Sequence, residues 1–192
     1  MRRIEPEIQA AVIDGDRPAM EGKFVLDIGS GGALILNRPF VESEQYLRPD
    51  RHTVPRLEGH GLGGGIDASV GRITGLQIGY FLIKHPVIVF SRAANGPFAS
   101  TESQGNIGAM ILEEFKAILD HKNNRVILEP NARFDEPTDY NRSGLILVSV
   151  GENYQRFRIK AVADDSPASE AGLRVGDTLI AIDGHQVSEL SI

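Results

Sequence analysis

Short apolar runs separated by glycines dominate the sequence, and they restrict the fold more than any other feature. Runs at 8–13, 33–36, 66–73, 76–82 and 87–90 have the length of strands rather than of helices. The chain contains 21 glycines among its 192 residues, and glycine supplies the tight turns that short strands need. We therefore expect the first part of the chain to be mainly β, with a polar surface loop over 42–58.

One longer segment has a different period. Between 107 and 121, apolar residues recur at helical spacing, with charged residues between them: Ile107, Met110, Ile111, Phe115, Ile118 and Leu119. This spacing predicts a helix over 107–121 that packs on the core and takes no part in chemistry. The next apolar run, at 125–128, is expected to be a strand.

The stretch 131–142 is mostly polar and follows a proline. Such composition is typical of a boundary between domains. We therefore expect one domain at 1–130, a linker at 131–142, and a second, smaller segment at 143–192.

The second segment carries local signals for both helix and strand. Ser166 suits the N-cap of a short helix, Pro167 suits its first position, and Gly172 suits its end. Strands are expected at 145–150, 157–162 and 178–182. A hairpin turn is expected at the Asp-Gly pair of 183–184.

The composition excludes several classes of function. The formal net charge is −6 and no basic stripe is present, so nucleic acid is not expected as a partner. There is no cysteine, which excludes disulfides and thiolate catalysis. The five histidines are scattered outside any metal motif, and no Gly-x-Ser-x-Gly elbow occurs. We expect neither a metal nor a cofactor.

The start of the chain does not look like a targeting segment. Met1-Arg2-Arg3 is followed by Ile4-Glu5-Pro6-Glu7, which is not the pattern of a signal peptide. No apolar run reaches the ~20 residues that a membrane-spanning helix needs. These observations predict either a cytoplasmic protein or a chain without its natural N-terminus.

A glycine-rich stretch at 59–64 satisfies the pattern G-x-G-x-x-G. A phosphate-binding loop of that kind needs a strand before it and a helix after it. The preceding segment is a poor strand and the following one is strand-like, so we reject nucleotide binding. A flexible hairpin is the better interpretation of these glycines.

The most informative stretch for function is Phe24-Val25-Leu26-Asp27-Ile28-Gly29-Ser30. An apolar strand that ends in aspartate gives a carboxylate a rigid mount, and a glycine turn can aim backbone N–H groups at its oxygens. Peptide hydrolysis by paired carboxylates needs such a mount. The two groups share one proton, so that one activates water while the other donates to the carbonyl oxygen. An ordinary turn aspartate is the competing interpretation.

Four parts of the sequence, in order, resemble the lobe of a retropepsin-like aspartic protease over residues 8–130. They are the aspartate loop at 26–30, the glycine hairpin at 61–65, the segment Ile-Gly-Ala-Met-Ile-Leu at 107–112, and the closing strand at 125–128. The resemblance implies Asp27 as the catalytic residue, supported by Ile28, Gly29 and Ser30. It also implies a flap over the substrate, formed by Leu62, Gly63, Gly64, Gly65 and Ile66.

Ile28 departs from the family pattern. The family has a hydroxyl residue at this position, and that hydroxyl bonds across the pair of aspartate loops. Isoleucine has no hydroxyl, and Ser30 lies too far along the chain to replace it. The departure favours an alternative function, in which the lobe holds a peptide or a protein without cleaving it.

The C-terminal segment resembles the PDZ domains of bacterial proteases. Residues 166–184 have the sequence SPASEAGLRVGDTLIAIDG, which matches that family's pattern of Ser-Pro-Ala, Ala-Gly-Leu, Gly-Asp and Ile-x-Gly. Ser143, Gly144, Leu145 and Ile146 stand where the family has its carboxylate-binding loop. PDZ domains bind a peptide as an added strand. The sequence stops before the expected second helix, so we expect an incomplete PDZ domain at 143–192.

Together the two resemblances imply a mainly β protein: a retropepsin-like β-barrel lobe with one helix, followed by a small, partial α+β PDZ domain. Bacterial predicted aspartyl proteases combine these parts and are usually exported, which implies a periplasmic or secreted location. The implied function is that of an aspartic endopeptidase acting on a peptide or protein substrate. One lobe supplies one aspartate, so a second lobe is required, from a homodimer or from an N-terminal half.

Overall fold

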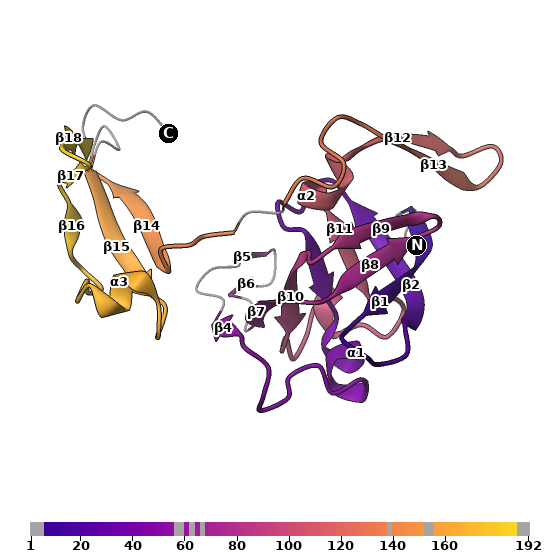
Figure 1. Ribbon diagram of the computed structural model, residues 1–192, viewed down its shortest axis with the longest axis horizontal. Helices are drawn as coiled ribbons and strands as arrows, with labels where there is room; N and C mark the ends of the chain where they lie inside the picture. Colours follow the sequence, from indigo (N-terminus) through magenta and orange to yellow (C-terminus); the bar gives the residue numbers. More distant parts are fainter. Residues whose placement is uncertain are drawn as a thin grey trace. The chain divides into compact units, whose positions relative to one another are not determined.

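The computed structural model describes residues 6–55, 60–61, 64–65, 68–137, 140–151 and 156–187. The chain divides into two compact units (Figure 1). The first contains Met1–Arg56 and His60–Asp139, and the second contains Leu57–Gly59 and Tyr140–Ile192. The mainly β class predicted from the sequence is confirmed by the strands in both units, and the exact domain limits stay a prediction.

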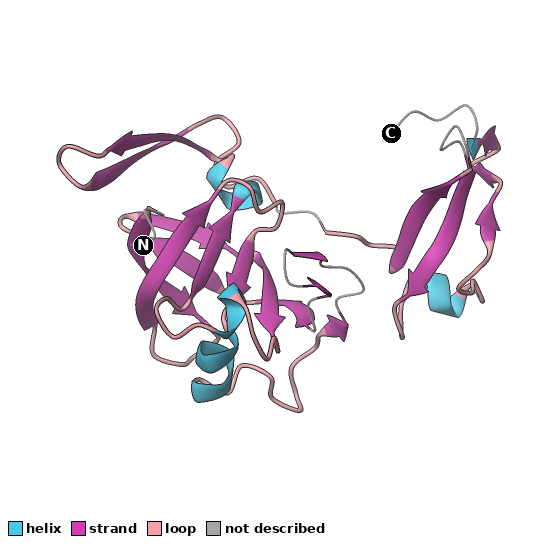
Figure 2. Cartoon of the chain, turned by 180° about the vertical axis from the view of Figure 1, so that it is seen from behind, coloured by secondary structure: helices cyan, strands magenta, loops and turns pink. Residues whose placement is uncertain are grey.

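The first unit is built on a nine-stranded sheet with the order β4-β7-β10-β3-β11-β2-β1-β8-β9 (Figures 1 and 2). Its strands are β1 (Glu7–Ile13), β2 (Met20–Asp27), β3 (Leu34–Leu36), β4 (Val54–Pro55), β7 (Ala68–Arg72), β8 (Gly75–Ile78), β9 (Phe81–Lys84), β10 (Val87–Ser91) and β11 (Gly105–Gly108). Two short hairpins accompany the sheet, β5 (His60–Gly61) with β6 (Gly64–Gly65), and β12 (Phe115–Asp120) with β13 (Arg125–Pro130).

The centre of the sheet places β11 between two strands that are consecutive in the chain. β11 runs parallel to β2, with Gly108 opposite Asp27, and antiparallel to β3, with Ile107 opposite Leu34. The connection from β2 to β3 must therefore cross the end of β11. This crossing connection carries the aspartate loop.

One hydrophobic core serves the whole first unit. It draws on β1, β2, β3 and β7 to β11, and Leu34, Leu36, Ile88, Phe90 and Ile107 are completely buried in it. Apolar residues are buried along the full length of β3 and β10, so both faces of these strands are covered. Continuous apolar runs, rather than alternating ones, are the pattern of such doubly covered strands.

The helix expected over 107–121 is wrong. The structure places β11 at Gly105–Gly108, a single helical turn α2 at Ala109–Leu112, and strand β12 at Phe115–Asp120. Ile107 and Phe115 are core residues, but Ile118 and Leu119 are exposed. The helix-like spacing of apolar residues therefore runs across two strands and one helical turn. β11 is a strand because it pairs with β2 and β3, which lie far away in the sequence.

The polar segment 42–58 is only partly the surface loop that we expected. Helix α1 (Arg38–Ser43) precedes it, and Tyr46 within it is completely buried against Phe40 and Phe90. The Arg51 side chain is also buried and lies over the Phe90 ring. An aromatic anchor and a buried arginine thus attach this segment to the core.

The first part of the expected linker packs on the first unit. Phe134 makes edge contacts with Phe81 and Phe115. The backbone N–H of Asn131 donates to the carbonyl of Glu114 at 3.0 Å. These contacts tie the chain after β13 to the lobe as far as Phe134.

The second unit contains a three-stranded sheet in the order β14-β15-β16, formed by β14 (Leu145–Val150), β15 (Arg156–Val162) and β16 (Thr178–Leu179). Helix α3 (Pro167–Glu170) begins as predicted, with the Ser166 hydroxyl accepting the Ser169 N–H. The hairpin of β17 (Ala181–Ile182) and β18 (His185–Gln186) turns at Asp183-Gly184, both with positive φ, which confirms that turn.

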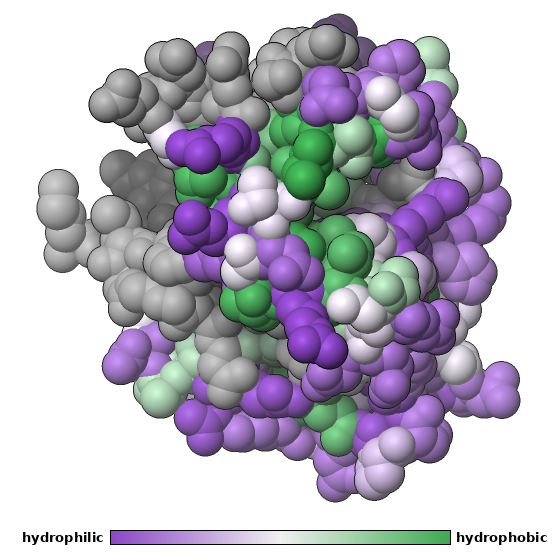
Figure 3. All heavy atoms as spheres, turned by 90° about the vertical axis from the view of Figure 1, so that its left-hand side faces the viewer, coloured by the Kyte–Doolittle hydropathy of each residue, from purple (hydrophilic) through white to green (hydrophobic). Residues whose placement is uncertain are grey.

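Exposed apolar residues mark the second unit. Among its described residues, the large exposed hydrophobic side chains are Tyr140, Leu147, Leu173, Val175, Ile180 and Ile182. Apolar surface open between polar side chains is visible in the side view (Figure 3). None of the helices in the described part of the chain has the length and apolarity that a membrane crossing requires.

Candidate active site

Asp27 is the last residue of β2, and the chain turns immediately after it. The N–H of Ser30 donates to the Asp27 carbonyl at 3.1 Å, which closes the turn. The N–H of Gly29 donates to Asp27 Oδ1 at 3.0 Å. A strand with buried apolar residues thus supplies the mount, and the glycine turn supplies a donor, as the sequence analysis expected of a carboxylate in this position.

Asn106 supplies a second donor to the same carboxylate. It lies in the middle of β11, next to β2, and its Nδ2 donates to Asp27 Oδ2 at 3.2 Å. Each oxygen of Asp27 therefore accepts one hydrogen bond from a different segment, which fixes the plane of the carboxylate. Asn106 could not be predicted from the sequence, because only the parallel pairing of β2 with β11 brings it to Asp27.

Gly108 makes room for the crossing connection above β11. A Cβ atom on Gly108 would lie 2.1 Å from the carbonyl oxygen of Gly32 and 2.8 Å from that of Ser30. The N–H groups of Gly108 and Ala109 donate to the carbonyls of Ala33 and Ser30, at 2.7 and 2.8 Å. These bonds lock the aspartate loop to the end of β11, and no residue larger than glycine fits at 108 without moving backbone.

Ile28 is 82% exposed beside the carboxylate. Single exposed apolar side chains are common on protein surfaces, so this exposure by itself marks no function. Gly29 is exposed and Ser30 is partly buried. In the part of the chain that the structure describes, no ion pair involves Asp27. Its hydrogen-bond donors are the uncharged amide groups of Gly29 and Asn106.

The glycines expected to form a flap do form a hairpin where the structure describes them. His60 pairs with Gly65 and Gly61 pairs with Gly64, in antiparallel register. The other flap residues of the sequence analysis, Leu62, Gly63 and Ile66, lie outside the described residues.

The predicted carboxylate-binding loop of the PDZ segment precedes and begins β14. Asn141 Oδ1 accepts the N–H groups of Ser143 and Gly144, each at 3.1 Å, and Ser143 Oγ accepts the N–H of Leu145 at 3.1 Å. Ile146 lies within the strand, opposite Ala161. Three backbone donors of this loop are thus already bound by side chains of the loop itself.

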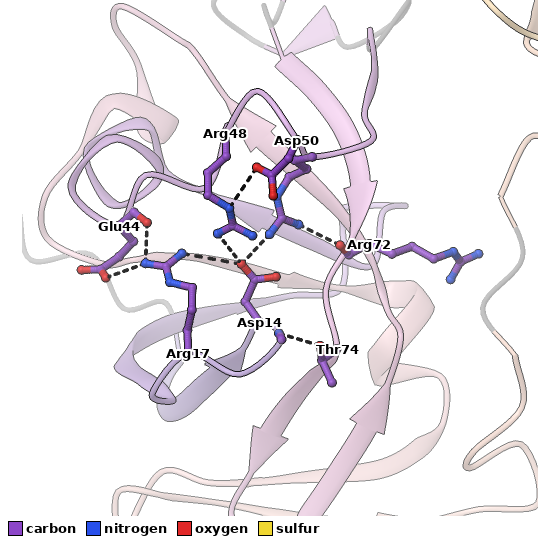
Figure 4. A network of polar contacts seen from close by, with 9 residues as sticks. Asp14, Arg17, Glu44, Arg48, Asp50, Arg72 and Thr74 are labelled. Atoms are coloured by element: carbon purple, nitrogen blue, oxygen red, sulfur yellow. Dashed lines mark hydrogen bonds and ion pairs between the residues drawn. The ribbon is translucent and has the colours of Figure 1, made fainter.

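A second carboxylate, Asp14, directly follows β1 in the connection to β2, and it is buried. Its Oδ2 accepts hydrogen bonds from Arg51 and, at 3.1 Å, from Arg48, and Arg17 lies 3.6 Å away (Figure 4). Burial raises the pKa of Asp14, but hydrogen bonds and charge from Arg51 and Arg48 outweigh it, and the pKa is lowered. This carboxylate is held as an anion by a structural network.

No group of three or more metal-binding side chains occurs among the described residues. The histidines that the structure describes thus do not converge with carboxylates into a metal site. The groups described at the aspartate loop are one carboxylate and two amide donors.

Comparison with known proteins gives two similarities. A family model described as PDZ domain matches residues 158–192, which confirms the PDZ resemblance there. No curated protein matches the chain. The crystal structure of a retropepsin-like aspartic protease from Rickettsia conorii is similar at 16% identity and a TM-score of 0.42, covering 64% of this chain and 88% of that chain. The chain is therefore similar to PDZ domains at its C-terminal end and, over 64% of its length, to a retropepsin-like aspartic protease.

Proposed function

We propose that this chain is one lobe of an aspartic endopeptidase, in which Asp27 is one of two catalytic carboxylates. One observation carries the proposal. Asp27 ends β2, immediately before the loop that crosses the end of the central strand β11. Each oxygen of its carboxylate accepts a hydrogen bond from one amide donor, and no cation pairs with it in the described chain. A carboxylate placed in this way keeps its orientation and stays available to water and to a second carboxylate.

The chemistry follows from pairing. Two carboxylates within hydrogen-bond distance cannot both stay ionised, so they hold one proton between them. The ionised member removes a proton from a bound water, whose oxygen attacks the peptide carbonyl, while the protonated member donates to the carbonyl oxygen. The Gly29 N–H and the Asn106 amide would hold the Asp27 carboxylate in plane through this exchange.

The second carboxylate must come from outside this lobe, because the described aspartate loop provides only Asp27. A second copy of the chain or a further lobe would supply it. The exposed Ile28 beside Asp27 is the surface that such a lobe would cover. The glycine hairpin of β5 and β6 would serve as the flap over the substrate, and Gly29 and Ser30 would position the carboxylate.

A second candidate function is a binding module that holds a peptide or a protein without cleaving it. Ile28 favours this alternative, because its side chain carries no hydroxyl with which to tie two aspartate loops together. The PDZ segment offers a further site for a peptide strand, but the donors of its loop are occupied by Asn141 and Ser143.

Cleavage of a mixed peptide library from acid to neutral pH tests the proposal. We expect cleavage in acid, inhibition by pepstatin-like compounds, and a fall of about a hundredfold to ten-thousandfold in the Asp27→Asn variant, because asparagine can neither hold the shared proton nor act as base. The variant's thermal unfolding is the control for an intact fold. It should match the wild type, since Asp27 lies at the end of its strand, outside the buried core.

The binding module predicts a different result. It gives no cleavage at any pH, and peptide binding that survives Asp27→Asn. If the chain, and a version extended by its natural upstream sequence, both fail to cleave, and the extension carries no second aspartate loop, the enzyme proposal is wrong.

A further inference from the structure

The loop before β14 has three consecutive backbone N–H groups, at the place where a PDZ domain is expected to capture a terminal carboxylate. All three are already bound. Asn141 Oδ1 accepts the N–H groups of Ser143 and Gly144, each at 3.1 Å. Ser143 Oγ accepts the N–H of Leu145, also at 3.1 Å. The donors that a terminal carboxylate requires are therefore occupied by side chains of the loop itself.

Further bonds hold the Asn141 side chain in this position. Its Nδ2 donates to the Leu145 carbonyl at 2.5 Å, and its Oδ1 also accepts the Ser143 hydroxyl at 2.8 Å. Both ends of the amide are thus bound at the start of β14. An entering carboxylate gains the loop donors only by breaking the bonds that Asn141 makes, so most of the free energy of its capture is lost.

The backbone of the loop is fixed from the side of α3. The Gly144 carbonyl accepts the N–H of Ala163 at 2.8 Å, and the Ser143 carbonyl accepts the N–H of Ala168 at 3.1 Å. Gly144 has a φ of +76°, and a Cβ atom on it would overlap the Cβ of Ser166. The loop therefore cannot turn its donors away from Asn141 without breaking its contacts with the residues that begin α3.

The outer edge of β14, in contrast, is open. β14 is the end strand of its sheet, so no described strand pairs with this edge. The N–H and carbonyl of Leu145 bond to the loop, so they point away from β15. Because polar groups of alternate residues point to the same side of a strand, those of Leu147 and Ser149 face the same open edge. β14 contains neither proline nor charge, the usual protections of an edge strand.

We propose that the PDZ segment binds internal, extended segments of a peptide along the edge of β14 and does not select a terminal carboxylate, with Asn141 as the residue that determines this specificity. The inference rests on the peptide-binding alternative of the proposed function and stands whether or not Asp27 cleaves peptides. An internal segment needs only the backbone groups of the edge and leaves the loop closed. It is also the form in which an endopeptidase meets its substrate.

Two display libraries of random heptapeptides supply the probes, one with a free terminal carboxylate and one extended by Gly-Ser-Gly. The full chain carries Asp27→Asn throughout, so that no peptide is cleaved. Selected peptides are synthesised with a terminal carboxylate or a terminal carboxamide and titrated by fluorescence anisotropy. We expect the two dissociation constants to agree within about twofold. A carboxylate form that binds about tenfold tighter overturns the proposal. Libraries that yield no binding peptide overturn it together with the peptide-binding alternative.

Asn141→Ala opens the loop and should create the missing preference. It frees the N–H groups of Ser143 and Gly144, so the carboxylate form should bind at least about tenfold tighter than the carboxamide, as expected of a hydrogen bond to a charged group. Asn131→Ala is the matched control, because Asn131 Oδ1 accepts the Arg133 N–H at 2.8 Å in the first unit. The control should keep the wild-type ratio, and an unchanged ratio in Asn141→Ala would overturn the assigned role of Asn141.

Methylation of peptide nitrogens tests the strand pairing without a change at Asn141, and so does not depend on how that variant folds. Alternate N–H groups of a bound strand point to the same side, so only one of two alternate sets faces β14. Methylation of that set removes its donors and should abolish binding, whereas methylation of the other set should leave the affinity intact. Equal effects of the two sets would overturn pairing along β14.

Discussion

Two carboxylates, one before β2 and one at its end, are held in opposite settings. In the connection between β1 and β2, Asp14 is buried, three arginines surround it, and the segment 44–51 is held on the core through the same contacts (Figure 4). At the end of β2, Asp27 is partly exposed and accepts hydrogen bonds from the neutral donors Gly29 and Asn106.

The difference contrasts a structural carboxylate with the one that we propose as catalytic. A carboxylate paired with several cations is fixed as an anion, and breaking the pairing would leave buried charges uncompensated. A carboxylate held by amide donors is oriented without being tied to a cation. Asp14 is the more strongly bonded of the two, and Asp27 is the one whose carboxylate has only neutral partners among the described residues.

Removal of Asp14 should have the largest effect on stability. Asp14→Ala leaves Arg51 buried without its carboxylate, and we expect the free energy of unfolding to fall by about 3–5 kcal/mol. Urea unfolding at neutral pH measures this change. Asp27→Ala is the matched control, with a smaller loss of about 1–2 kcal/mol, because Asp27 is partly exposed and its removal leaves no buried charge unpaired. Equal losses in the two variants would remove the contrast between the two carboxylates.

Acid should weaken the Asp14 network next. The pKa of Asp14 is lower in the folded chain than in the unfolded chain. Its ionised form therefore contributes stability above the unfolded-state pKa of about 3.9, and this contribution is lost as the pH falls through the folded-state pKa. Burial raises the pKa of Glu114 in the folded chain. Protonation of Glu114 in acid therefore favours the folded state and opposes the loss of stability at Asp14.

Urea midpoints measured from neutral to acid pH check this dependence. The wild type should lose stability in acid, whereas Asp14→Asn should start lower and lose less. A parallel decline of the two proteins would mean that other carboxylates control acid unfolding. The lower pH limit of any peptidase activity should coincide with this loss of stability.

On β11, beside the end of β2, replacing Asn106 should lower catalysis, with a smaller loss of stability than Asp14→Ala. Asn106→Ala removes the donor to Asp27 Oδ2, and a hydrogen bond to a charged group contributes about 1.5–3 kcal/mol. We expect kcat to fall by about tenfold to a hundredfold, with KM unchanged, since Asn106 orients the carboxylate. Steady-state kinetics measure both constants, and a rise in KM at constant kcat would assign Asn106 to substrate binding instead.

Ile28→Thr should have the smallest effect. Threonine restores a hydroxyl that can bond across two aspartate loops, so activity should stay equal or rise by up to about tenfold, the size of one net hydrogen bond. The same peptide assay measures it, with Ile28→Val as a control that changes the shape without adding a hydroxyl. A loss of activity with threonine but not with valine would show that Ile28 makes an apolar contact that the second lobe requires.

Local elements with strong signals of their own could be predicted from the sequence. The mainly β class, the strand that ends in Asp27, the Ser166–Pro167 helix start and the Asp183-Gly184 turn all follow from nearby residues, because capping, positive φ and apolar runs act over a few positions. The PDZ resemblance has the same origin, in a continuous motif that matches a family model over 158–192.

Tertiary structure decided what depends on pairing between distant segments. The run at 107–121 has helical spacing, yet β11 becomes a strand because β2 and β3 provide hydrogen-bond partners on both of its sides. The same pairing brings Asn106 to Asp27, across 79 positions of sequence. Folding likewise brings Arg51 onto Asp14, 37 residues away. The spacing of apolar residues along the chain carries no information on such contacts. Strand register and ion pairing depend on segments that are distant in sequence and meet only in the folded chain.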